Sequence, residues 1–117
     1  MTADNHVTVD ALAAQLGLDV EVHGRRFEAP VLGAIVSDLL SFVMADGKPG
    51  WVWVTIQTHS NIVAVATLND MAAVVIASGF EPDEDTIARA DEEGIGLLTT
   101  RQSAFEVAGR LYAMGIR

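Results

Sequence analysis

Apolar residues recur at helical spacing near the start of the chain and then give way to alternation. The first pattern predicts a helix over residues 8–17, with Thr8 as its N-cap and Gly17 as its stop. Its apolar stripe consists of Val9, Leu12, Ala13 and Leu16. Residues 19–23 alternate in polarity, which is typical of a strand. A helix-turn-helix needs its recognition helix at that place, so we expect no DNA-reading motif here.

Four apolar runs farther along the chain have the length of strands. They cover residues 31–36, 51–56, 73–77 and 96–99. The run from Trp51 to Ile56 is the clearest, because it is apolar on both faces. Such a pattern is typical of a parallel strand that helices cover on both sides.

Helices are predicted in the connections between these runs. Ser37 or Asp38 can cap a helix that carries several apolar residues. These residues are Leu39, Leu40, Phe42, Val43 and Met44. Residues 57–72 contain β-branched residues that favour a strand by propensity, but the segment is long enough for a helical crossover. We therefore expect a helix there, with Asn61 as its N-cap.

The last two helices carry the clearest end signals. Acidic residues gather at 81–85, where the helix dipole is positive, and Gly94 with Ile95 fits a helix end that packs back on Ala90. The final helix begins with a capping box formed by Ser103 and Glu106 and ends before Gly115. Its buried face is predicted to carry Phe105, Ala108, Leu111 and Tyr112.

These elements predict an α/β fold with three layers and a mostly parallel sheet. Its C-terminal part is a βαβαβα unit resembling half of a Rossmann fold, and right-handed crossovers make its three strands point the same way. The chain has 117 residues, which suits one α/β domain over residues 1–117 with its short helix and strand at about 8–23.

Charge and composition narrow the function classes. Seven Lys and Arg against 16 Asp and Glu give a net charge of −9, which opposes binding to nucleic acid and to anionic membranes. The chain has no Cys, which excludes disulfides and thiolate metal sites. Residues 49–69 carry no charge, but the polar residues 57–61 would lie at the centre of a bilayer, so we expect no span. The first ten residues do not resemble a secretory signal, so we expect a cytoplasmic protein.

Hydrophobic residues make up 50% of this short chain, which suggests association. Trp51 and Trp53 lie on one face of their strand, where they either pack beneath a helix or meet a second subunit. We expect a symmetric homodimer.

Candidate ligand-binding residues follow the three C-terminal strands, because ligands settle outside the carboxyl ends of strands in open α/β sheets. They are Gln57, Thr58, His59, Ser60, Asn61, Ser78, Gly79, Thr99 and Thr100. Arg101 and the helix start at Ser103 lie at the same edge. Each residue also has a plain interpretation as a helix cap or strand end, so the cluster is more informative than any member.

Catalytic and metal-binding motifs are weak in this sequence. An imidazole such as that of His59 can act as an acid or a base, but the loop around His59 contains no carboxylate and no nucleophile elbow. His6, His23 and His59 are far apart, and neither a Walker pattern nor a dinucleotide fingerprint follows a strand. We therefore predict no catalytic residue, no metal and no cofactor. The acidic run over residues 81–93 is interpreted as a solvated helix face.

Several stretches of the sequence resemble the DRTGG domain, a small α/β module similar in fold to the N-terminal domain of HPr kinase/phosphorylase. The likeness covers about residues 31–114 and rests on residues 36–40, 51–56, 78–82, 94–95 and 103–106, with the Gly-Phe-Glu-Pro turn at 79–82 the most telling. Thr58-His59 stands where that family has Asp-Arg, and Ala77-Ser78-Gly79 where it has Thr-Gly-Gly. The chain thus resembles a divergent standalone member.

The resemblance implies a noncatalytic regulatory role. We predict a module that senses a small polar or anionic ligand, for example a nucleotide, and signals to a partner protein. Similar standalone members accompany hydrogenase-type redox systems, which implies a redox or signalling partner. Two alternatives stay open: a small enzyme that uses His59 as acid or base, and a structural subunit of a redox complex.

Overall fold

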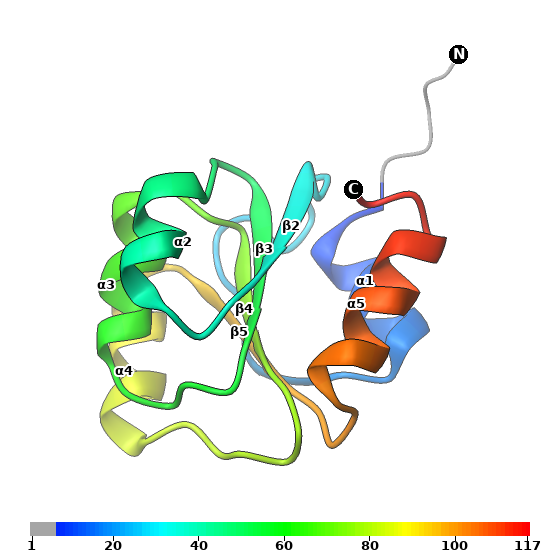
Figure 1. Cartoon of the computed structure of the whole chain (residues 1–117). Helices are drawn as coiled ribbons and strands as arrows, with labels where there is room; N and C mark the ends of the chain where they lie inside the picture. Colours follow the sequence, from blue (N-terminus) through cyan, green and yellow to red (C-terminus); the bar gives the residue numbers. More distant parts are fainter. Residues whose placement is uncertain (1–6) are drawn as a thin grey trace.

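A computed structural model describes residues 7–117 as a five-stranded sheet between two layers of helices (Figure 1). The strands are β1 (Asp19–Val22), β2 (Gly33–Val36), β3 (Trp51–Thr55), β4 (Ala73–Ile76) and β5 (Gly96–Thr99). The helices are α1 (Val9–Leu16), α2 (Leu40–Asp46), α3 (Asn61–Leu68), α4 (Glu84–Glu93) and α5 (Ala104–Ala113). The predictions for His6 and for a leader rest wholly or partly on residues 1–6, which lie outside this description.

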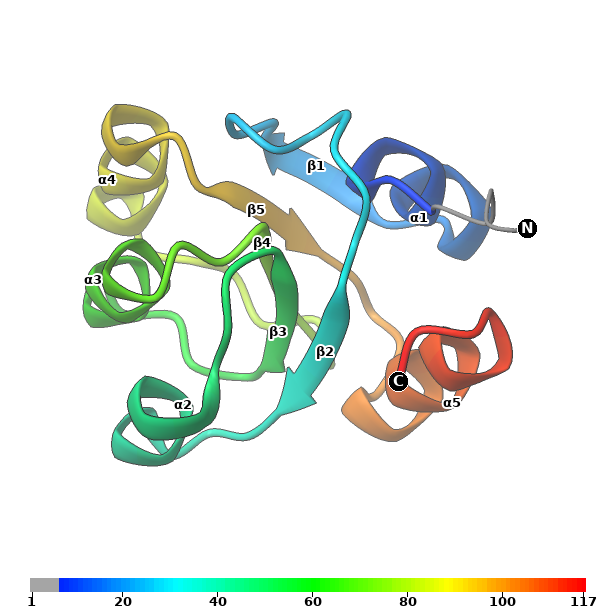
Figure 2. The same cartoon turned by 90° about the horizontal axis from the view of Figure 1, so that it is seen from above.

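The strand order in the sheet is β1-β5-β4-β3-β2. Strands β2 to β5 are parallel, and β1 runs antiparallel to β5 at one edge. Helices α2, α3 and α4 cover one face of the sheet, while α1 and α5 cover the other (Figure 2). The predicted three-layer α/β class is confirmed, and the N-terminal strand adds an antiparallel edge to it.

Each face of the sheet carries its own hydrophobic core. Val52 and Val54 of β3 pack with α1 and α5, whereas Trp53 packs with α2, α3 and α4. Neighbouring positions point to opposite faces because the side chains of a strand alternate. Both faces are buried, which explains why β3, β4 and β5 are apolar without interruption.

Several predicted helix ends are confirmed. The Thr8 hydroxyl accepts a hydrogen bond from the Ala11 amide, and Gly17 takes the left-handed conformation that ends α1. Gly94 ends α4 in the same conformation. Ser103 and Glu106 form the capping box at the start of α5.

The predicted caps of α2 and α3 are wrong. Helix α2 follows Leu39, which has no side-chain cap, because the Ser37 hydroxyl instead accepts from the Leu39 amide in the preceding turn. Helix α3 follows Ser60, so Asn61 is its first residue and not its cap.

The predicted buried face of α5 is also partly wrong. Phe105 is 87% exposed and Tyr112 is 61% exposed. Val107 and Leu111 are the buried residues, and the pair is spaced four residues apart on the side that faces the sheet. The helix is therefore turned so that both of its aromatic side chains lie in solvent.

Trp51 and Trp53 pack beneath helices. This is the first of the two interpretations offered for them, the other being contact with a second subunit. Trp53 is fully buried, and its Nε1 donates to the Ser37 carbonyl at 2.7 Å. Trp51 is half-buried, with the Lys48 ammonium 5.8 Å from its ring centroid. Trp53 has no surface left for a second subunit.

The connection between β1 and β2 crosses the amino edge of the parallel strands. The Arg25 amide donates to the Gly94 carbonyl at 2.8 Å, and the Leu32 amide donates to the Gly50 carbonyl at 3.0 Å. An ion pair between Arg26 and Asp70 adds a third attachment. This segment covers the amino edge of the parallel strands, and a second pocket of about 440 Å³ lies on it, lined by His23, Gly24, Arg25, Phe27 and Glu28. Within residues 7–117, no helix has the length and apolar character needed to cross a membrane.

Candidate ligand-binding site

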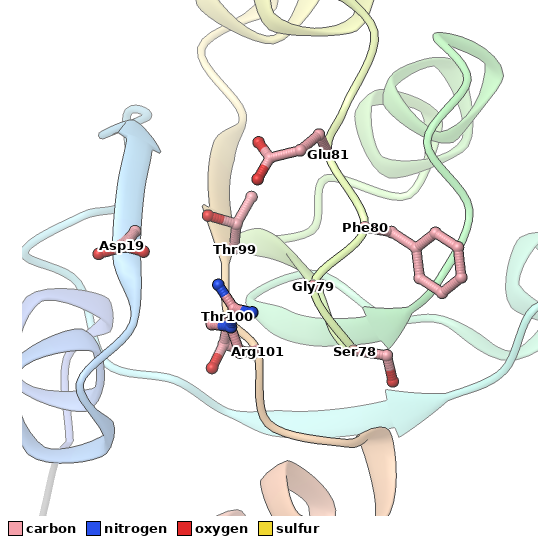
Figure 3. Close-up of a pocket in the computed structure, with 8 residues that line it drawn as sticks. All are labelled: Asp19, Ser78, Gly79, Phe80, Glu81, Thr99, Thr100 and Arg101. Carbon is pink, nitrogen blue, oxygen red and sulfur yellow. The ribbon is translucent and has the colours of Figure 1, made fainter.

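A pocket of about 320 Å³ opens at the carboxyl ends of β4 and β5. It is lined by Asp19, Ser78, Gly79, Phe80, Glu81, Thr99, Thr100 and Arg101 (Figure 3). Four of the nine predicted site residues meet here, namely Ser78, Gly79, Thr99 and Thr100. They lie at or just after the carboxyl ends of two neighbouring parallel strands. This agrees with the edge rule, by which ligands bind outside the carboxyl ends of the strands in open α/β sheets.

The β4–α4 loop is held in a fixed shape at this pocket. Ser78 and Gly79 have φ angles of +64° and +78°, and the first of these is uncommon for a residue with a side chain. The Ser78 amide donates to the Gln102 carbonyl at 2.7 Å, and the Gly79 amide donates to the Thr100 carbonyl at 2.9 Å. The turn is thereby fastened to the segment after β5, and these two amides are already engaged.

Gln102 extends this attachment to the helices on the far side. Its side-chain amide donates to the Leu16 carbonyl at 2.8 Å, and its carbonyl oxygen accepts from the Arg110 guanidinium at 2.7 Å. The floor of the pocket is therefore tied through one residue to the end of α1 and to α5. Sequence reasoning passed over Gln102, because nothing local marks a side chain whose partner lies 86 positions away.

Three lining residues, Asp19, Phe80 and Glu81, were not predicted as site residues, and Asp19 lies far in the sequence from those that were. The antiparallel register pairs Asp19 with Thr99, so β1 brings a carboxylate to the edge where the parallel strands end. Phe80 and Glu81 directly follow Ser78 and Gly79 in the sequence, and that adjacency was a usable signal. Arg101 was placed at this edge from the sequence, and it lines the pocket.

The predicted loop over residues 57–61 does not line the pocket. The Thr58 carbonyl accepts from the Asp83 amide at 3.2 Å and from the Thr86 hydroxyl at 2.7 Å, which joins the loop to the start of α4. His59 is exposed, and its Nδ1 accepts from the Asn61 amide at 3.4 Å. Gln57 and Ser60 flank these contacts. The geometry gives this loop a bracing role between α3 and α4.

Asp38 anchors the same loop to β2. One Asp38 carboxylate oxygen accepts from the Thr55 hydroxyl at 2.7 Å and from the Ile56 amide at 2.9 Å. The Gln57 side chain donates to the Asp38 carbonyl at 3.0 Å. The sequence suggested Asp38 only as a helix cap, whereas its carboxylate ties the carboxyl ends of β2 and β3 together.

At this edge, some backbone amides at the N-termini of helices already donate hydrogen bonds to nearby side chains. At α5, the Glu106 carboxylate accepts from the Ser103 amide at 3.1 Å, and the Ser103 hydroxyl accepts from the Glu106 amide at 3.1 Å. At α3, His59 occupies the Asn61 amide. The amides of Asn61, Ser103 and Glu106 are therefore already engaged. In the described part of the chain, no three His, Cys, Asp or Glu residues form a group that could hold a metal ion.

Comparisons with known proteins agree with this architecture. The family model of the DRTGG domain matches residues 9–114. A solved structure of the CBS and DRTGG domains from the regulatory region of Clostridium perfringens pyrophosphatase, complexed with the activator diadenosine tetraphosphate, is similar with a TM-score of 0.74 and 15% identity. The match covers 96% of this chain and 48% of that one, so the chain spans about half the length of that structure. No curated protein matches the sequence.

Proposed function

Since the chain belongs to the DRTGG domain family, we propose that residues 1–117 act as one noncatalytic regulatory domain that binds a small polar or nucleotide ligand. The ligand site is the pocket at the carboxyl ends of β4 and β5. Its bound state is passed to a partner protein, and a redox or signalling system is the class of partner that we propose.

The pocket itself is the observation that carries this proposal. Its volume lies at the small end of the range for pockets that hold small molecules. Its lining combines three hydroxyl groups, two carboxylates and one guanidinium around a turn with a fixed backbone. Such a set of groups favours a polar ligand, and the fixed turn lowers the entropic cost of binding it.

Two further observations support regulation over catalysis. The similar pyrophosphatase structure is of a regulatory region, and its bound nucleotide is an activator. His59, the one histidine predicted at this edge, is exposed, and its Nδ1 accepts from a backbone amide. Within residues 7–117, Arg26 and Asp70 form the one ion pair, so none of the described carboxylates forms an ion pair with His59.

The first test is a thermal-shift panel of nucleosides, nucleoside phosphates, sugar phosphates and inorganic anions. A ligand at 100 times its Kd is expected to stabilise the folded domain by about 2.7 kcal/mol, because it binds the folded state alone. Amide chemical shifts recorded during titration should change at Ser78–Glu81 and Thr99–Arg101 and stay fixed at His59–Asn61. A panel without a hit, or shifts confined to His59–Asn61, would reject this pocket as the ligand site.

We also propose that two copies associate through the β2 edge of the sheet. The β1 edge carries Asp19 and Glu21 and an irregular register, features that discourage strand pairing. The four residues of β2 carry no charge, and Val36 at the end of the strand and Leu32 just before it are exposed. An apolar groove of about 240 Å³ runs between β2 and α5. In a chain of net charge −9, an edge without acidic side chains is where two copies repel each other least.

Light scattering is expected to give twice the 12.4 kDa mass of one chain. Val36→Lys places a charge on the β2 edge and should shift the protein to the single-chain mass. Leu68→Lys is the matched control, because Leu68 is exposed on α3, away from that edge. A mass near 12.4 kDa at every concentration of the wild type would contradict the dimer.

A further inference from the structure

The location of the pocket indicates only that a ligand can bind there, whereas the charged groups that line it restrict the chemistry of that ligand. Arg101 is the basic residue in the lining, and Asp19 and Glu81 are the acidic ones. In the view of Figure 3, the Arg101 nitrogens lie between Asp19 and the Ser78–Gly79 turn. The one ion pair within residues 7–117 is elsewhere, between Arg26 and Asp70. Among the described residues, Arg101, Asp19 and Glu81 therefore form no salt bridges.

The backbone adds little capacity for an anion. The amides of Ser78 and Gly79 already donate to carbonyls, and the Thr100 amide donates to the Ile76 carbonyl at 3.0 Å. These three lining amides are therefore not available in the way that the unengaged amides of a phosphate-binding turn are. One guanidinium has to supply most of the attraction for a negative group.

Two carboxylates beside one guanidinium disfavour a ligand that is purely anionic. Free phosphate or pyrophosphate would meet Asp19 and Glu81 as like charges. A ligand that offers hydroxyl or amino donors to those carboxylates and one phosphate to Arg101 satisfies all three groups.

Phe80 adds an aromatic surface to this arrangement. It lines the pocket and is half exposed, and its ring lies beyond the Ser78–Gly79 turn, on the side away from both Asp19 and Arg101 (Figure 3). An exposed ring of this kind stacks well on a nucleobase. A volume of about 320 Å³ suits one nucleoside unit better than two.

From these observations, and resting on the proposed function, we propose that the pocket binds a nucleoside monophosphate. Arg101 binds the phosphate, Asp19 and Glu81 accept hydrogen bonds from the sugar hydroxyls, and Phe80 stacks on the base. Free polyphosphate is rejected by the two carboxylates.

Calorimetric titration with four probes tests this assignment. The probes are adenosine 5′-monophosphate, adenosine, ribose 5-phosphate and pyrophosphate. The wild type should bind the monophosphate most tightly and pyrophosphate most weakly. Arg101→Gln should weaken both phosphorylated sugars by roughly tenfold to a hundredfold and leave adenosine unchanged, because a charge-assisted hydrogen bond to the phosphate is lost. Arg89→Gln removes an equal charge from an exposed position on α4 and should change nothing.

Variants of the two carboxylates and of the Phe80 ring should change the affinities for different probes. The double variant Asp19→Asn and Glu81→Gln should weaken adenosine binding and strengthen pyrophosphate binding, whereas Asp46→Asn on α2 should do neither. Phe80→Ala should weaken the two probes that carry a base and spare ribose 5-phosphate. Phe105→Ala, which removes an exposed ring from α5, is its control.

The outcomes separate this inference from the function on which it rests. Pyrophosphate binding as tight as the monophosphate, or an Arg101→Gln variant that loses adenosine equally, would overturn the assignment. Another compound that shifts the pocket resonances while all four probes fail would also overturn it, and the ligand-sensing role would stand. If no compound reaches the pocket, both proposals fail.

Discussion

Trp53→Ala is expected to lower the free energy of unfolding by about 3–5 kcal/mol, the usual cost of truncating a large buried aromatic side chain. Trp53 is fully buried in the core beneath α2, α3 and α4. Its strand neighbours in the sheet are Ile35 on β2 and Val74 on β4, so alanine leaves a cavity at the centre of that face. Urea denaturation followed by circular dichroism measures the change.

Two control variants separate the causes of this loss. Trp53→Phe keeps an aromatic ring but removes the Nε1 donor, so the Ser37 carbonyl loses its partner and a cost of about 1–3 kcal/mol is expected. Trp51→Ala should cost less than Trp53→Ala, because Trp51 is only half-buried. An equal loss from Trp51→Ala and Trp53→Ala would contradict the packing described for this face.

The elements that the sequence predicted correctly are those with local signals. Strand β3 is uninterrupted in its apolar character, and the ends of α1 and α5 carry side chains that bond their own first turns. Such signals involve only a few neighbouring residues, so they can be recognised in the sequence before the fold is known. The common direction of β3, β4 and β5 was predicted as well, because right-handed crossovers through helices return the chain to the same edge of the sheet.

The wrong prediction for the buried face of α5 depends on contacts between distant segments. Phe105 and Tyr112 have the spacing of a buried stripe, but the sheet lies on the side of Val107 and Leu111. An amphipathic pattern with two apolar stripes does not reveal which of them meets the core. The second stripe of α5 is the exposed one.

The candidate site was predicted in part for the same reason. The edge rule selected the residues after β4 and β5, because parallel strands deliver their loops to one side. Asp19 enters the pocket through the antiparallel pairing of β1 with β5, which joins positions 80 residues apart. The loop over residues 57–61 obeys the edge rule as well, but Thr58 turns toward α4 and away from the pocket lining.

Gly24→Ala is expected to be nearly as damaging as the loss of Trp53, although it adds a single methyl group. Gly24 has a φ of +81°, and a Cβ at this position would lie 2.3 Å from the Gly96 amide nitrogen and 2.9 Å from the Ile95 carbonyl carbon. Both atoms belong to the backbone at the start of β5, which has no flexible side chain that could yield. Overpacking of this kind costs about 1–3 kcal/mol. The left-handed φ adds roughly 1–2 kcal/mol for a residue with a Cβ.

Gly17→Ala separates the cost of the left-handed φ from the cost of overpacking. Gly17 has a φ of +70°, but a Cβ added to it would have nothing within 4 Å. Urea denaturation should therefore show a loss of about 1–2 kcal/mol for Gly17→Ala, the conformational cost alone, and a clearly larger loss for Gly24→Ala. Gly24 also begins the segment that closes the amino edge of the sheet and directly follows β1 and His23. Hydrogen exchange should accordingly speed up in β1 and at the start of β5 in Gly24→Ala, since the added methyl group pushes these strands apart. Equal losses for the two variants would show that the close approach of Gly24 to β5 contributes nothing to stability.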